Sequence, residues 1–183
     1  MLHLSKTQIE KLKNMANAGR AGEIQAYSRY EAITGHIWRC ACKARENENE
    51  QLTKIRVAVN IRDRMKPPLP HGYFGNAMLI TVATSRAGEL MSWSLCYASS
   101  KLGEPKGFSM GTQILQSRAG LGFPSTVQIL DGERKFTWAQ GALGFDGKGF
   151  IIPGHDEDGS LVIPLSLQAA HMEAFEKFFY MDI

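Results

Sequence analysis

The fold of this chain is most constrained by two serines that can cap the start of a helix. Segments with the periodicity of strands follow them. Ser5 with Gln8, and Ser28 with Glu31, have the spacing of a capping box, in which two side chains satisfy the first amides of a helix. Apolar residues then recur at helical spacing. We therefore expect one helix from Leu4 to about Asn17 and another from Ser28 toward Arg45.

The middle of the chain predicts two strands and a further helix. Apolar residues at every second position from Ile55 to Ile61 indicate a half-buried strand. Prolines within 67–70 favour an extended connection, because proline has no amide hydrogen for a sheet. The run Asn76–Thr84 predicts a second, more buried strand, and the pattern that starts at Leu90 predicts a helix to about Lys101.

The end of the chain predicts a hairpin and a closing helix. FIIPG and SLVIPLSL are separated by the turn-rich HDEDG, and Gly159 suits the backbone of such a turn. Ala169–Tyr180 then carries Met172, Phe175, Phe178 and Phe179 on one helix face. The chain thus combines helices and strands, and we expect an α/β protein.

Composition narrows the class of protein further. With 183 residues and 44% hydrophobic residues, the chain is long enough for one domain or for part of something larger. The net charge of +3 comes from scattered Lys and Arg, without the clustered basic face that nucleic-acid binding needs. No apolar run reaches membrane-spanning length, and the first residues are polar and amphipathic. We expect no nucleic-acid partner, no membrane and a cytoplasmic location.

The three cysteines fit this expectation. An odd number of cysteines argues against a disulfide framework and suits a reducing compartment. Cys40 and Cys42 lie in the second predicted helix, where packing explains them better than a metal site, because further ligands are missing nearby. We predict no metal site.

Three blocks carry a resemblance to a known family. YSRYEAITGHIWRCACKAR, VNIRDRMKPPLPHGYFGN and DGSLVIPLSLQAAHMEAFEKFFYMDI resemble the C-terminal half of the plant BAHD acyltransferases. The nearest branch is the hydroxycinnamoyl transferases, with the spermidine type favoured over the shikimate type. The resemblance covers residues 1–101 and 141–183. It implies that residues 1–183 form a partial, truncated C-terminal domain of the two-domain, chloramphenicol acetyltransferase-like fold of CoA-dependent acyltransferases.

The resemblance also implies the reaction of the family and the general base that this reaction needs. In the family, a His of a His-x-x-x-Asp motif in the N-terminal domain deprotonates an amine or hydroxyl acceptor, which then attacks an acyl-CoA thioester. None of the five histidines here has Asp four residues later. We therefore predict no catalytic residue and an inactive chain on its own. The family's co-substrate is acyl-CoA, here hydroxycinnamoyl-CoA with a polyamine such as spermidine or a shikimate-like acceptor, and no cofactor is held permanently.

Arg62, Asp63 and Arg64 are the predicted cofactor-binding residues. They stand where the family has Arg-Ser-Arg, which the resemblance places beside CoA. Two guanidinium groups suit phosphates, whereas Asp63 adds negative charge that weakens such a site. A solvated turn is the alternative for these residues. The same resemblance places Thr81–Ser85 near CoA, and turn residues at a hairpin explain Asp156–Asp158 better than a metal or acid–base site.

Two other functions stay open for such a fragment. It can be a non-catalytic remnant that binds acyl-CoA weakly, or one that binds a partner. Without its neighbouring domain, the chain is also expected to expose apolar interdomain surface and to associate through it.

Residues 102–140 match neither the family nor a regular secondary structure. The family's Asp-Phe-Gly-Trp-Gly motif is missing, and Gln128–Gly141, QILDGERKFTWAQG, stands in its place. The genetic code allows codons for Gln128–Gly132 that encode that motif when they are read one base out of frame. The same displacement turns Ser109–Leu115 into Tyr-Gly-Asn-Pro-Asn-Leu. It continues through Gln116–Val127 as Ala-Val-Thr-Ser-Trp-Val-Arg-Leu-Pro-Ile-Tyr-Gly-Ser, which resembles the family's substrate-pocket strand and its approach to the missing motif.

A single shift that restores the expected blocks in order favours an out-of-frame translation over an ordinary long surface loop. We therefore predict that residues 102–140 are out of frame and poorly ordered within the domain. The nucleotide sequence of this region tests the hypothesis, because codons incompatible with the proposed third bases would contradict it.

Overall fold

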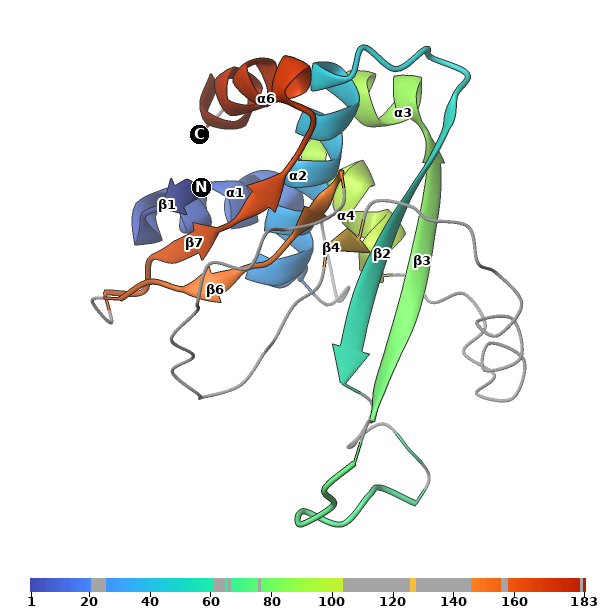
Figure 1. The fold of residues 1–183 in the computed structure, drawn as a ribbon, viewed down its shortest axis with the longest axis vertical. Helices are drawn as coiled ribbons and strands as arrows, with labels where there is room; N and C mark the ends of the chain where they lie inside the picture. The colour runs from blue at the N-terminus through green and yellow to red at the C-terminus, as the bar shows by residue number, and fades with distance from the viewer. Residues whose placement is uncertain are drawn as a thin grey trace.

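A computed structural model describes residues 1–20, 26–60, 65, 67–75, 77–103, 126–127, 146–155, 158–181 and 183. The prediction of an out-of-frame segment falls almost wholly outside these residues, since the structure describes only 102, 103, 126 and 127 of it. Helices gather on one side of the molecule and a long hairpin runs along the other (Figure 1).

The two predicted capping boxes are present. Helix α1 spans Lys6–Asn17 and α2 spans Arg29–Ala44. The Ser5 amide donates to Gln8 Oε1 at 2.9 Å, and the Gln8 amide donates to Ser5 Oγ at 3.3 Å. The prediction that the first helix includes Leu4 is wrong. Leu2–Leu4 forms strand β1, which pairs antiparallel with β7 (Leu161–Ile163) and buries both leucines.

The two predicted strands form the long hairpin. Strand β2 spans Leu52–Asn60 and β3 spans Met78–Arg86, and they pair antiparallel along their full length. The second strand therefore starts and ends two residues later than Asn76–Thr84. In Figure 1 the hairpin reaches beyond the rest of the molecule, and the connection between its strands lies at that far end.

The single helix predicted from Leu90 to about Lys101 is wrong, because two helices cover this region. Helix α3 spans Ala87–Ser92 and α4 spans Leu95–Gly103. The backbone of Trp93 is extended, with ψ 168°, and its amide closes α3 by donating to Glu89 O at 3.0 Å. The chain thus turns at Trp93 and starts a new helix.

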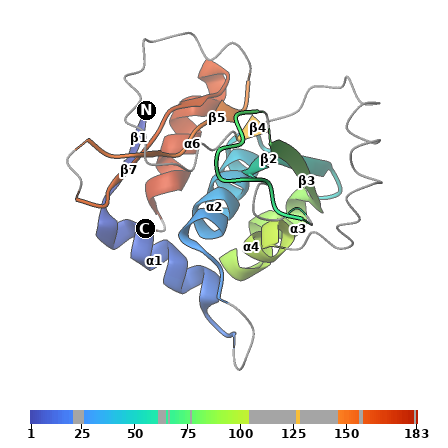
Figure 2. The ribbon, with the colours of Figure 1, turned by 90° about the horizontal axis from the view of Figure 1, so that it is seen from below.

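Two sheets complete the fold. A three-stranded sheet has the order β1-β7-β6, with β6 at Ile152–Pro153, and a five-stranded sheet has the order β3-β2-β4-β5-β8. In the latter, β4 is Thr126–Val127, β5 is Lys148–Gly149 and β8 is Leu165–Ser166. Figure 2 shows β4 between β2 and β5. The pairing of β6 with β7 confirms the predicted hairpin, and Gly159 has a φ of 82° in its turn.

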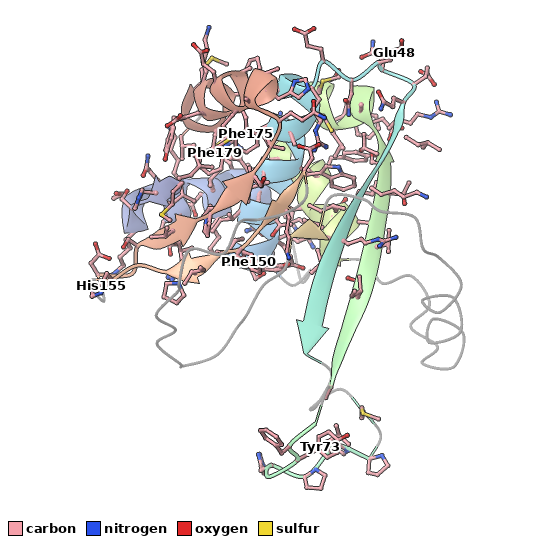
Figure 3. All side chains as sticks on the ribbon, in the orientation of Figure 1. Glu48, Tyr73, Phe150, His155, Phe175 and Phe179 are labelled. Carbon is pink, nitrogen blue, oxygen red and sulfur yellow. The ribbon has the colours of Figure 1, made fainter. Side chains whose placement is uncertain are left out.

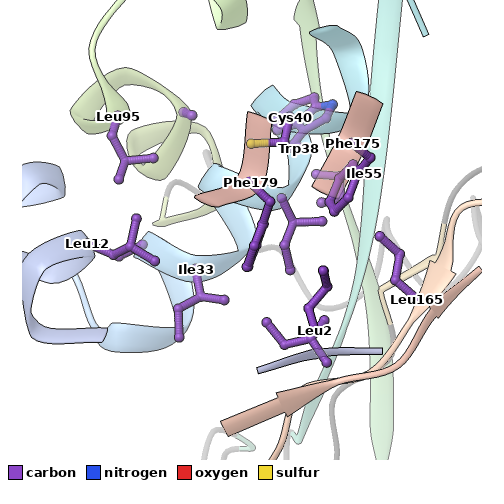
Figure 4. Close-up of a cluster of buried hydrophobic side chains, with 14 of the residues drawn as sticks. Leu2, Leu12, Ile33, Trp38, Cys40, Ile55, Leu95, Leu165, Phe175 and Phe179 are labelled. Atoms are coloured by element: carbon purple, nitrogen blue, oxygen red, sulfur yellow. The ribbon is translucent and has the colours of Figure 1, made fainter. Parts of the chain in front are cut away.

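Helix α2 lies at the centre of the core. Helix α6, Ala169–Met181, packs against it and buries Phe175 and Phe179 completely. Figure 4 shows side chains from α1, α2, α6, β1 and β2 meeting in this cluster. Cys40 and Cys42 are both buried in α2, which confirms the packing role predicted for them.

Candidate functional site

The predicted CoA-binding residues follow directly on β2. Arg62, Asp63 and Arg64 lie outside the described residues, so their role stays a prediction. The structure does describe the strand that leads to them, which ends at Asn60 opposite Met78. Figure 3 places Tyr73 in the connection at the far end of the hairpin, away from the helices.

Two hydroxyls of the predicted Thr81–Ser85 stretch have partners within the protein. Thr81 Oγ1 donates to Val57 O at 3.3 Å across the hairpin. Ser85 is buried at the junction of β3 and α3, and its Oγ donates to Glu89 Oε2 at 3.1 Å and lies 3.1 Å from Tyr97 Oη. These contacts tie the hairpin to the helices.

Ser85, Glu89 and Tyr97 form the tightest polar cluster of the hairpin junction. Tyr97 Oη donates to Glu89 Oε2 at 2.5 Å. This hydrogen bond, ahead of the one from Ser85, lowers the pKa of Glu89 below its ordinary value. A carboxylate with a lowered pKa is a poor general base at neutral pH. The cluster therefore joins β3, α3 and α4 and does not resemble a catalytic dyad.

The cluster was not expected from the sequence. Ser85 and Glu89 are four residues apart, which is a weak local signal. Tyr97 joins them only because α4 starts anew after Trp93.

Two histidines lie in helices, where one packs in the core and the other contacts the end of a neighbouring helix. His36 is buried, and its Nε2 lies 2.8 Å from Phe179 O, linking α2 to α6. His171 Nδ1 lies 3.1 Å from Ala44 O at the end of α2. Both agree with the packing or surface roles that the sequence favours, and neither has the aspartate of the family's motif.

A cavity of about 280 Å³ lies between α2, β2, β8 and Gly147, the residue before β5. Its floor includes Trp38 and Cys42 of α2, and Trp38 Nε1 donates to Thr53 Oγ1 at 3.1 Å beside it. Burial raises the pKa of the Cys42 thiol, which keeps the thiol neutral. At the rim, Arg45 and Asp146 form an ion pair of 2.7 Å. Sequence reasoning missed this cavity, because its walls come from segments far apart in the chain.

The structure shows no metal-binding cluster in the part of the chain that it describes. No three His, Cys, Asp or Glu side chains gather there. Asp158 instead accepts a hydrogen bond of 2.8 Å from the amide of Ser160, as expected for a turn residue, whereas Asp156 and Glu157 lie outside the described residues. Among the described helices, none combines the length and the apolar character needed to cross a bilayer.

Comparisons with known proteins agree on one family. The sequence profile described as the Transferase family matches residues 1–130, so the match extends beyond residue 101, where the resemblance was expected to end. The hydroxycinnamoyl-CoA:piscidic acid hydroxycinnamoyltransferase of Actaea racemosa is 38% identical over an alignment that covers 100% of this chain and 49% of that protein. The shikimate O-hydroxycinnamoyltransferase of Nicotiana tabacum is 33% identical, with 97% and 46% covered. The chain thus spans about half the length of these relatives.

Solved structures show the same fold. TRI101 of F. sporotrichioides, complexed with coenzyme A and T-2, matches with a TM-score of 0.75 at 17% identity, covering 95% of this chain and 47% of that one. Vinorine synthase matches with a TM-score of 0.69 at 17% identity, with 94% and 44% covered. The described helices and sheets are therefore part of the fold of CoA-dependent acyltransferases. The chain belongs to the Transferase family, the BAHD acyltransferases, and within that family it is related to the hydroxycinnamoyl-CoA transferases.

Proposed function

We propose that this chain is the C-terminal portion of a hydroxycinnamoyl-CoA-dependent acyltransferase and that these 183 residues alone do not catalyse the transfer. The observation that supports the proposal is that no histidine of the sequence fits the family's catalytic motif. None is followed by Asp at the fourth position, and the two in helices contact backbone carbonyls. General-base catalysis needs a group within hydrogen-bond reach of the acceptor's proton, and no histidine of the sequence stands in the motif that supplies this group in the family.

Incubation of the purified chain with p-coumaroyl-CoA and an acceptor tests this proposal. We expect release of free CoA thiol at the rate of the blank, with either spermidine or shikimate as acceptor. An intact hydroxycinnamoyltransferase serves as the positive control under identical conditions. Turnover above the blank that grows in proportion to the concentration of the chain would overturn the proposed inactivity.

For the complete enzyme we propose a polyamine such as spermidine as acceptor. Shikimate-type enzymes carry an Arg before the Cys-Pro-Asn-Leu block, whereas the displaced reading of Ser109–Leu115 gives Tyr-Gly-Asn-Pro-Asn-Leu without it. A guanidinium suits the carboxylate of an acid acceptor and repels a cationic amine. A full-length protein that carries the restored reading tests this choice, and a preference for shikimate over spermidine in direct competition would contradict it.

The second candidate is a non-catalytic protein that binds acyl-CoA through Arg62 and Arg64. The observation in its favour is sequence order, since both follow directly on β2, whose pairing with β3 is complete up to Asn60. Calorimetry with CoA compares the wild-type chain with an Arg62→Ala/Arg64→Ala variant. Arg29→Ala/Arg86→Ala is the matched control, because it removes the same charge from exposed ion pairs elsewhere.

This candidate is supported if the heat of CoA binding is lost in the Arg62→Ala/Arg64→Ala variant and retained in the Arg29→Ala/Arg86→Ala control. Equal heats in all three proteins, or none in any, would remove it. The cytoplasm is the proposed location for either candidate, since all three cysteines are free, as they are in reducing compartments.

We further propose that the chain associates through the exposed face of the β2–β3 hairpin. Leu52, Ile80 and Val82 are 65%, 49% and 52% exposed there. Ile80 and Val82 are two residues apart on β3, and Leu52 pairs with Arg86 four residues beyond Val82, so the side chains of Leu52, Ile80 and Val82 share one face of the hairpin. Neighbouring exposed apolar side chains such as Ile80 and Val82 favour contact with another protein or domain.

A further inference from the structure

The connection between β2 and β3 carries a short proline-rich segment at the far end of the long hairpin. Pro67, Pro68 and Pro70 are exposed, and Leu69 between them is half-buried. Figure 3 shows the side chains of this connection well away from the helices and from the core. We use the name "proline tip" for residues 67–75, all of which the structure describes.

The sequence of the proline tip restricts its backbone to an extended conformation. The proline ring holds φ at about −65°, close to the value of about −75° in a polyproline II helix. Pro67 and Leu69 each precede a proline, and that position disfavours helical backbone angles. Residues 68–70 accordingly lie in neither a helix, a strand nor a turn. The segment Pro67–Pro70 therefore favours polyproline II.

Two contacts within the proline tip order the chain directly after this segment. The Tyr73 amide donates to Pro70 O at 2.9 Å and closes a turn. The Tyr73 ring lies against Gly75, where an added Cβ atom would be only 2.7 Å from the ring carbon Cζ. The hairpin strands hold both ends of the connection. Binding through these prolines therefore costs less conformational entropy than binding through the same residues in a free peptide.

The prolines have the spacing that polyproline-binding domains recognise. Polyproline II has three residues per turn, so Pro67 and Pro70 lie on one edge of the segment, about 9 Å apart. Domains that bind such segments use a groove lined by aromatic side chains, which accepts the exposed proline rings. In WW domains this groove takes two consecutive prolines, and Pro67 and Pro68 supply such a pair.

We propose that the proline tip is a docking site for a protein partner with a WW-type, aromatic-lined polyproline groove. The partner's aromatic rings pack on Pro67, Pro68 and Pro70, and the ordered turn that ends at Tyr73 keeps these rings accessible. This interaction is independent of acyl transfer, since it uses the tip of the hairpin and no catalytic group.

A fluorescein-labelled WW domain tests the proposal with the full 183-residue chain. The domain is one that binds the free peptide MKPPLPHG, which is the sequence of residues 65–72. We expect a saturable rise in fluorescence anisotropy, with a dissociation constant for the chain at or below that for the peptide. No rise, or a dissociation constant more than about tenfold above that of the peptide, would overturn the proposal.

Matched variants and a competitor identify the surface that the WW domain contacts. Pro67→Ala/Pro70→Ala should weaken binding at least about tenfold, while the circular dichroism spectrum stays unchanged. Pro153→Ala is the control, because it removes an exposed proline ring from β6 and should leave binding unchanged. Equal effects of both changes would overturn the proposal. Excess free peptide should displace the chain; if it does not, the domain binds elsewhere and the proposal fails.

Vesicles separate this partner from a lipid surface. Phe74 lies in the proline tip and is fully exposed, and aromatic side chains also suit the interface of a membrane. We expect the chain to stay in the supernatant when phosphatidylserine vesicles are sedimented. Co-sedimentation that Phe74→Ala abolishes, together with no binding of the WW domain, would overturn the proposal in favour of a membrane contact.

Discussion

Replacing Phe179 by alanine tests whether α6 is an integral part of this core. The Phe179 side chain is fully buried and stacks on Phe175, with ring centroids 5.7 Å apart. Its ring also lies 5.1 Å from that of His36 on α2. Truncation of such a residue removes its transfer free energy and leaves a cavity, which together destabilise a protein by about 3–5 kcal/mol. A domain has a free energy of unfolding of about 5–15 kcal/mol, so the loss is a large part of the total.

Urea unfolding followed by tryptophan fluorescence measures this loss. We expect an unchanged m-value and a free energy of unfolding lower by about 4 kcal/mol, or a thermal midpoint lower by roughly 8–16 °C. Phe74→Ala is the matched control, because it removes the same atoms from a side chain that is 103% exposed. Its effect on the free energy of unfolding should stay within about 0.5 kcal/mol. A loss below about 1 kcal/mol for Phe179→Ala would refute the reasoning.

Three further predictions concern a helix start, a titration and a surface. Ser5→Ala removes the cap of α1 and should lower the free energy of unfolding by about 1 kcal/mol in urea titrations, whereas Ser5→Asp, which keeps an acceptor, should not. The Tyr97 hydrogen bond lowers the pKa of Glu89, so its stabilisation is present above the ordinary pKa of 4.5 and is lost as pH falls further. The thermal midpoints of wild type and Tyr97→Phe should therefore differ at neutral pH and converge in acid; a constant difference would contradict this cause. Ile80→Thr/Val82→Thr should reduce association in sedimentation velocity, and an unchanged association constant would place the contact elsewhere.

Local chemistry made the helix starts predictable. A capping box needs only residues within one turn, so Ser5 and Ser28 mark the starts of α1 and α2 correctly from sequence alone. The alternation in β2 and the turn at Gly159 are local signals of the same kind. These features depend on residues that are close in sequence, and all of them are present in the structure.

Features that depend on distant partners were not predictable. Leu4 fits a helical pattern by spacing, but its pairing with Leu161 makes it part of a strand. The break at Trp93 and the cavity beneath Arg45 likewise depend on packing between separate segments. For the candidate site, resemblance to the family supplied Arg62 and Arg64, and no local pattern of helix or strand was involved.

The pairing of β1 with β7 also has a consequence for synthesis on the ribosome. The His3 amide donates to Tyr180 Oη at 2.9 Å, and Tyr180 Oη donates back to His3 O at 3.1 Å. His3 and Tyr180 are 177 residues apart, so β1 finds these partners only after that stretch has been translated. At about 5–20 residues per second this delay is roughly 10–30 s, during which Leu2 and Leu4 have no native cover. Holdase chaperones that recognise short apolar segments have that interval in which to bind the nascent chain.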